Sequence, residues 1–102
     1  MKRKVRAMPA YVIVETDIHD ADRYEQYKAA SPAAVAGGGG HFLVRGGELA
    51  VLEGDWKPTR LVVVEFEDLD AVKRWYDSPE YQQAKKLRDG AASLRMVAVQ
   101  GI

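Results

Sequence analysis

The sequence of 102 residues contains no cysteine and only two histidines, His19 and His41. The lack of cysteine excludes disulfides, thiolate nucleophiles, iron–sulfur clusters and zinc sites built on cysteine. Two histidines are too few for a histidine-rich metal site, and the chain has no recognisable nucleotide-binding or metal-binding motif. We therefore expect no bound metal and no cofactor.

An excess of charge of either sign is also missing. The chain has 15 Lys and Arg residues against 15 Asp and Glu residues, and its isoelectric point is about 6.7. It therefore lacks the broad positive field that attracts nucleic acids and anionic membranes. The apolar run Tyr11–Val14 stops at Glu15, far short of the roughly 20 apolar residues that span a bilayer. We expect neither a nucleic-acid partner nor a membrane segment.

The first residues are basic, but they do not form a signal peptide. Arg6 and Pro9 interrupt the only stretch that could serve as the apolar core of such a peptide. We interpret residues 1–8 as a flexible, solvated tail of a cytoplasmic protein. Hydrophobic residues make up 47% of the chain, enough for one core and not for two. Residues 9–102 are accordingly predicted to form a single domain.

The first half of the chain reads as a strand followed by a helix. Tyr11–Thr16 is rich in β-branched and aromatic residues, as strands are. Asp20 can cap a helix that places Tyr24 and Tyr27 on one stripe. Because proline cannot donate a hydrogen bond to the preceding turn, Ser31-Pro32 is expected to interrupt this helix. We interpret the four glycines that follow, residues 37–40, as a helix end and turn rather than a phosphate-binding loop.

The middle of the chain reads as extended structure around a glycine pair. His41–Arg45 and Leu49–Glu53 flank Gly46-Gly47, a pair suited to a tight hairpin turn or a bulge. The pattern leaves open which face of the sheet His41 and Arg45 occupy, because a slip of one residue exchanges the faces. Leu61–Val64 is continuously apolar and is the best candidate for a central strand.

The last third repeats the helix and strand pattern. Asp68 can cap a helix that places Val72 and Trp75 on one side. Ser78-Pro79 is predicted to interrupt that helix and restart it. Alternation over residues 94–99 then indicates a half-buried closing strand.

The resulting order, β-α-β-β-α-β, predicts an α+β ferredoxin-like fold, in which two helices cover one face of an antiparallel sheet. The other face carries apolar strand residues and has no helix to cover it. In so small a domain, a second copy of the chain is the simplest cover. We therefore expect a homodimer that associates through its sheets, as in a dimeric α/β barrel.

Three arginines near predicted strand ends, Arg45, Arg60 and Arg95, are candidate ligands for a carboxylate or phosphate. The alternative is that they form ion pairs with nearby glutamates. Three aromatic residues could form the walls of a pocket for a planar ligand: Trp56, Trp75 and Tyr76. For Trp75, at helical spacing, an ordinary place in the core is the alternative.

Two residues are candidates for moving a proton. His41 is of the residue type most often used as a general base, and Glu65 stands within an otherwise apolar strand. The alternatives are an exposed histidine on an edge strand and a carboxylate with partners in an interface. No third group that would orient either residue is evident from the sequence.

Several segments resemble a bacterial family called domain of unknown function 1330. The resemblance covers roughly residues 9–102 and is carried by Arg45–Gly47, Glu53–Pro58, Arg60–Phe66 and Trp75–Tyr81. It implies a ferredoxin-like member of the dimeric α/β-barrel superfamily, which also includes cofactor-independent monooxygenases, lactone isomerases and haem-degrading enzymes. The family itself has no established activity from which catalytic residues could be transferred.

Two hypotheses about function follow. In the first, the protein binds a small anionic or aromatic metabolite and acts on it without a cofactor. In the second, it is a dimeric module without catalytic activity that binds a ligand or a protein, and its arginines stabilise the interface. Fold alone does not choose between them.

Overall fold

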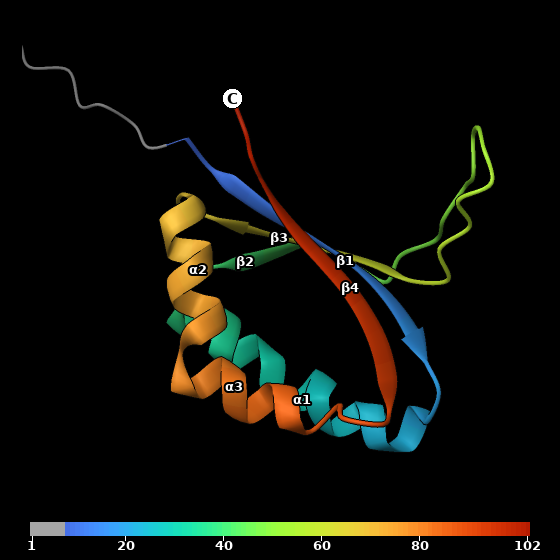
Figure 1. The fold of residues 1–102 in the computed structure, drawn as a ribbon, viewed down its shortest axis with the longest axis horizontal. Coiled ribbons are helices and arrows are strands. Elements are labelled where there is room, and N and C mark those ends of the chain that lie inside the picture. The colour runs from blue at the N-terminus through green and yellow to red at the C-terminus, as the bar shows by residue number, and fades with distance from the viewer. Residues whose placement is uncertain (1–7) are drawn as a thin grey trace, which may run out of the picture.

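The computed structural model of the protein describes residues 8–102. Its elements follow one another as strand, helix, two strands, two helices and a final strand (Figure 1). All but the last residue of the tail predicted for residues 1–8 lies outside the described residues.

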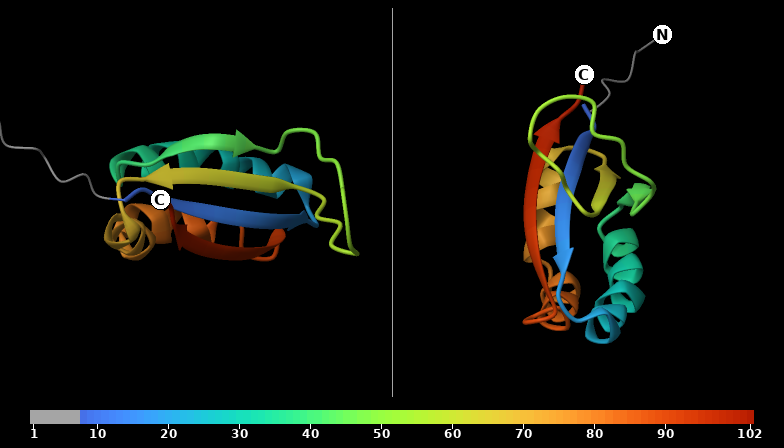
Figure 2. Two further views of the ribbon diagram at one scale, coloured as in Figure 1. Left: turned by 90° about the horizontal axis from the view of Figure 1, so that it is seen from above. Right: turned by 90° about the vertical axis from the view of Figure 1, so that its right-hand side faces the viewer.

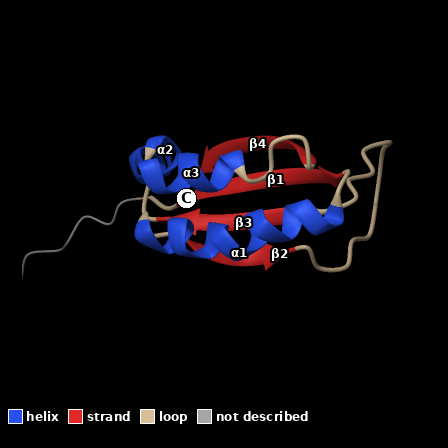
Figure 3. Ribbon diagram, turned by 90° about the horizontal axis from the view of Figure 1, so that it is seen from below, coloured by secondary structure: helices blue, strands red, loops and turns tan. Residues whose placement is uncertain are grey.

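Four strands form one antiparallel sheet in the order β2-β3-β1-β4. They are β1 (Ala10–Ile18), β2 (His41–Arg45), β3 (Leu61–Phe66) and β4 (Ala92–Gln100). Three helices lie against one face of the sheet (Figure 3): α1 (Ala21–Gly37), α2 (Leu69–Asp77) and α3 (Pro79–Lys86). The predicted α+β ferredoxin-like arrangement is confirmed. The opposite face, called here the outer face, carries no helix (Figure 2).

Side chains alternate along β1 between the two faces of the sheet. Ala10, Val12, Val14 and Thr16 are buried beneath the helices, whereas the residues between them are only half-buried. A period of two is the signature of a strand with two different environments, and it confirms that this segment is a strand. The inner face of the sheet is therefore the floor of the core.

Aromatic side chains fill the space between this floor and the helices. Tyr81 is fully buried, and its ring centroid lies 4.3 Å from that of Trp75. Tyr27, on α1, contacts Tyr81, and the two hydroxyl oxygens are 2.9 Å apart. The core thus joins α1, α2 and α3 through three large rings.

The two Ser-Pro pairs behave differently. At Ser78 the backbone is extended, and the serine hydroxyl accepts a hydrogen bond from the N–H of Tyr81 and caps α3, so the predicted interruption is confirmed. At Pro32 the prediction is wrong, because α1 runs without a break from Ala21 to Gly37. The missing proline N–H leaves the carbonyl of Lys28, four residues earlier, without its helical donor. The guanidinium of Arg45 supplies that donor at 2.8 Å.

The hairpin predicted around Gly46-Gly47 is also wrong. Leu49–Glu53 is not a strand, and an irregular loop over residues 46–60 extends beyond the end of the sheet (Figure 1). Leu52 is 93% exposed, so the apolar residues of this segment do not pack against the rest of the protomer. The glycines at 37–40 do end α1, as predicted: Gly38 is its C-cap, and Gly39 has a φ of 82°.

A bulge in β2 determines the orientation that the sequence left open. His41 pairs with Glu65 and Phe42 with Val64, but the register then shifts, so that Arg45 pairs with Val62. The extra residue turns the end of the strand over. His41 therefore lies on the outer face, whereas Arg45 lies on the inner face beside the helices.

Candidate ligand-binding site

A cavity of about 30 Å³ lies between the inner face of the sheet and the helices. Aromatic residues from three elements contribute to its walls: Tyr24, Tyr27, Phe42 and Trp75. The polar residues around it include Thr16, Arg45 and Arg60. Small-molecule sites typically combine an apolar wall with a few polar groups in this way.

Three buried polar atoms of this lining have no hydrogen-bond partner in the described protein: Thr16 Oγ1, Arg60 Nε and Trp75 Nε1. Leaving such an atom unpaired costs about 1–3 kcal/mol. Buried polar groups in folded proteins are nearly always paired, so three exceptions around one cavity are unusual. They make this cavity the candidate ligand site of the protein.

The backbone holds Thr16 and Arg60 side by side. The N–H of Thr16 donates to the carbonyl of Arg60 at 3.0 Å, which continues the β1–β3 ladder by one residue. The hydroxyl of Thr59 donates to the carbonyl of Thr16, also at 3.0 Å. Both side chains therefore belong to the same end of the cavity.

Gly46 and Tyr24 fix the guanidinium of Arg60. Its central carbon lies 5.9 Å from the centroid of the Tyr24 ring, within the range of cation–π attraction. A Cβ at Gly46, where φ is 73°, would stand 2.2 Å from Arg60 Nη1. The backbone angle favours glycine at this position, and a larger residue would also displace the guanidinium of Arg60 from where it lies.

Arg45 lies at the exposed edge of the same cavity. Besides its bond to the carbonyl of Lys28, its guanidinium lies 4.7 Å from the centroid of the Phe42 ring. It thereby ties the edge strand β2 to α1. Among the described residues, neither Arg45 nor Arg60 has a carboxylate within ion-pair distance.

The link between Pro32 and Arg45 yields a testable coupling. Pro32→Ala restores the helical donor to the carbonyl of Lys28 and is expected to raise the free energy of unfolding by about 1–2 kcal/mol. Arg45→Ala alone is expected to lower it by about 1 kcal/mol, because the carbonyl loses its partner. In the Pro32→Ala background, the same change should cost clearly less, because only the contact with Phe42 is then lost. Urea denaturation of the two single variants and the double variant measures the coupling, and purely additive effects would show that the bond does not stabilise the helix.

Arg95 does not join the other two arginines. It lies on the outer face, where its Nε donates to Glu15 across the β1–β4 pair at 2.8 Å. The ion-pair alternative drawn from the sequence is correct for this residue. Only Arg45 and Arg60 converge.

His41 and Glu65 also lie on the outer face, away from the cavity. The Nε2 atom of His41 is 2.8 Å from a Glu65 oxygen, and Tyr11 is paired with Glu65 from the other side. Partial burial and the neighbouring Glu65 carboxylate raise the pKa of Tyr11. The structure thus joins the two candidates for proton transfer, but across the sheet from the aromatic walls.

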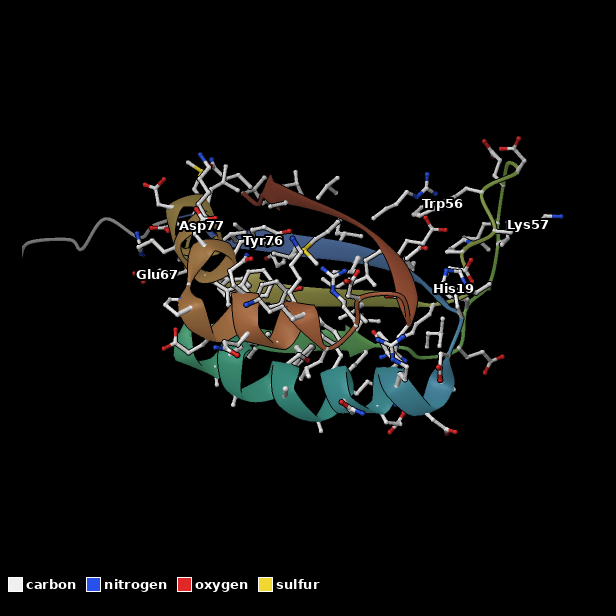
Figure 4. The ribbon with its side chains drawn as sticks, turned by 60° about the horizontal axis from the view of Figure 1, so that its bottom comes forward. His19, Trp56, Lys57, Glu67, Tyr76 and Asp77 are labelled. Atoms are coloured by element: carbon white, nitrogen blue, oxygen red, sulfur yellow. The ribbon has the colours of Figure 1, made fainter. Side chains whose placement is uncertain are left out.

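The three candidate wall aromatics do not all line the cavity. Trp75 is buried in the core and forms part of the cavity wall. Tyr76 is half-buried beside it and faces a separate groove between α2 and β4. Trp56 lies on the loop at the far end of the sheet (Figure 4). Its side chain is 53% exposed. Within one protomer, Trp56 does not reach the cavity.

The sequence interpretation missed two features of this region. The sequence indicates Thr16 only as the end of a strand, whereas in the structure it continues the inward alternation of Val12 and Val14. The hydroxyl pair of Tyr27 and Tyr81 was not foreseen either. Burial, reinforced by Tyr81, raises the pKa of Tyr27 well above its usual value, so its hydroxyl stays neutral.

No cluster of three or more His, Cys, Asp or Glu side chains in the described part is placed to hold a metal ion. Within residues 8–102, no helix is both long and apolar enough to cross a membrane.

Comparison with known proteins agrees with the architecture. The family model described as domain of unknown function 1330 matches residues 9–102. No curated protein matches the chain. A solved protein of unknown function from Rhodopseudomonas palustris, RPA0582, superposes with a TM-score of 0.73 at 20% identity, covering 95% of this chain and 85% of its own.

Two other solved structures share the fold. SnoaB from Streptomyces nogalater, described as a cofactor-independent oxygenase, has a TM-score of 0.67 at 15% identity and covers 94% of this chain and 95% of its own. A protein from Bacteroides fragilis, described as dimeric and ferredoxin-like, has a TM-score of 0.58 at 19% identity and covers 90% and 95%. At these identities the likeness shows the fold alone.

Proposed function

The chain belongs to the domain of unknown function 1330 family, and from that premise we propose that it binds a small aromatic metabolite in the cavity between its sheet and its helices. The observation that carries the proposal is the cluster of unpaired, buried polar atoms within an aromatic lining. A ligand that is apolar in its body and polar at one end would satisfy both kinds of surface.

The cavity must open to admit such a ligand. Its volume of about 30 Å³ equals the share of roughly one water molecule in the liquid. Half-buried Lys28 and exposed Arg45 border it and have long side chains that can swing outward, with the bond from Arg45 to the Lys28 carbonyl broken at a cost of about 1 kcal/mol. The proposal therefore includes a movement of these side chains on binding.

The proposal also includes a homodimer, in which two copies of the chain associate through their outer faces. The outer face carries exposed apolar side chains, including Val97 at 63% and Val99 at 50%. A matching face on a second copy would remove them from water, and two neighbours are described as dimeric ferredoxin-like proteins. The dimer would also enclose the pair of His41 and Glu65.

Binding without catalysis is favoured by the position of the titrating groups. His41 and Glu65 lie on the face of the sheet opposite the cavity, so a ligand in the cavity would not contact them. Oxygen uptake in the presence of each bound compound is the activity to assay first, since a structural neighbour is described as a cofactor-independent oxygenase. Uptake that depends on the compound would replace the binding function with an enzymatic one.

A thermal-shift screen of aromatic metabolites tests binding directly. A ligand at about 100 times its dissociation constant stabilises a protein by roughly 2.7 kcal/mol, which corresponds to several degrees in a domain of this size. Val62→Ile adds one methyl group beside the cavity and is expected to weaken binding about tenfold. Val63→Ile makes the same change one residue along, on the outer face, and should leave binding intact. A screen without a single shift, or equal losses in the two variants, would contradict a ligand site in the cavity.

A further inference from the structure

The end of the cavity formed by β1 and β3 differs from the rest because two unpaired polar groups meet there. Thr16 is 1% exposed, and its hydroxyl has no partner. The Nε of Arg60, on the neighbouring strand, is buried and unpaired as well. The backbone hydrogen bond between the two residues keeps them adjacent.

Both groups can donate a hydrogen bond, and only one of them carries a charge. A hydroxyl donates or accepts, whereas Nε–H of a guanidinium only donates. Their natural common partner is an acceptor oxygen with negative charge. The lack of a protein carboxylate within ion-pair distance of Arg60, among residues 8–102, leaves that partner to be supplied from outside.

We propose that Arg60 and Thr16 bind the carboxylate of an aromatic acid, whose ring lies against Tyr24 and Tyr27. This inference rests on the proposed function and assigns a substrate class to the same cavity. One carboxylate oxygen accepts from Arg60 Nε and from the Thr16 hydroxyl. The planar guanidinium suits a planar carboxylate, to which it can donate two parallel hydrogen bonds.

The arrangement of neighbours indicates that this place for Arg60 is built into the fold. Gly46 lies directly against the guanidinium, which would have to move if a Cβ were present, and the Tyr24 ring lies within cation–π range of it. Arg45, in contrast, already donates to the carbonyl of Lys28. Arg60 is therefore the anchor for the acid, and Arg45 closes the edge of the cavity.

Two matched compounds test the charge. Benzoate and benzamide have the same shape and differ in the carboxylate, so the protein should bind benzoate at least tenfold more tightly. Phenyl phosphate distinguishes a carboxylate site from a general anion site and should bind more weakly than benzoate. The Nε–H resonance of Arg60, identified by its loss in Arg60→Lys, should shift on addition of benzoate and not on addition of benzamide.

Three variants test the residues. Thr16→Val keeps the shape of the side chain and removes the hydroxyl, so benzoate should bind at least fivefold more weakly although the melting temperature of the free protein does not fall. Thr16→Ser retains the hydroxyl and should bind benzoate as the original protein does. Arg95→Lys, on the outer face, is the control for charge and should have no effect on binding.

The outcomes separate this inference from the proposed function. Equal affinity for benzoate and benzamide, or unchanged benzoate binding in Thr16→Val and Arg60→Lys, would overturn the carboxylate assignment and leave a ligand site in the cavity standing. Tighter binding of phenyl phosphate than of benzoate would likewise overturn it. Failure of these probes and of every aromatic compound in the thermal-shift screen would overturn both.

Discussion

Tyr81→Ala is expected to lower the free energy of unfolding by about 3–5 kcal/mol, the range for removing a large aromatic side chain from a core. Tyr81 is fully buried, and its ring packs 4.3 Å from Trp75 and 5.4 Å from Tyr76, measured between centroids. Its hydroxyl is also the partner of Tyr27. The change therefore removes the contact that joins the three helices and leaves a buried hydroxyl unpaired.

A domain of this length has a total stability of only about 5–15 kcal/mol, so this loss is a large part of the whole. Urea denaturation followed by tryptophan fluorescence measures it. Tyr81→Phe is the matched control, because it keeps the ring and removes the hydroxyl, and it should cost about 1–2 kcal/mol. Equal losses in the two variants would mean that the hydroxyl pair, rather than ring packing, holds the helices together.

The fold was predictable because its main signals are local. The β-branched and aromatic residues of β1 and the caps at Asp20 and Asp68 are properties of short segments, and the structure confirms the strand and both caps. The errors occur where local structure depends on residues that are distant in the sequence. Pro32 does not interrupt α1 because Arg45, from another element, bonds to the carbonyl that the proline leaves free.

The candidate site was predictable in residue type and not in grouping. Arg45, Arg60 and Arg95 look alike in sequence, each near the end of a strand. Arg95 pairs with Glu15 on the outer face, whereas the bulge in β2 places Arg45 on the inner face. Both placements depend on strand register. Thr16 was missed because an unpaired hydroxyl is a property of the folded core, which the sequence does not reveal.

Val97→Lys is expected to convert the proposed dimer into a monomer. Val97 is 63% exposed on the outer face, where it pairs with Ile13 across β1 and β4. In a symmetric dimer each substitution counts twice, so two lysines would enter the apolar interface together. Burial and mutual repulsion of these charges cost several kcal/mol, and about 3 kcal/mol corresponds to a dissociation constant raised more than 100-fold.

Light scattering after size-exclusion chromatography gives the mass, which should be about twice 11.3 kDa for the original protein and 11.3 kDa for Val97→Lys. Leu87→Lys is the control, because it introduces the same charge just beyond α3, on the helical side of the molecule, and should leave the dimer intact. Circular dichroism establishes that both variants are folded. A dimeric Val97→Lys variant would mean that the chains associate through another surface, such as the apolar loop over residues 46–60. A monomeric original protein would show that no second copy covers the outer face.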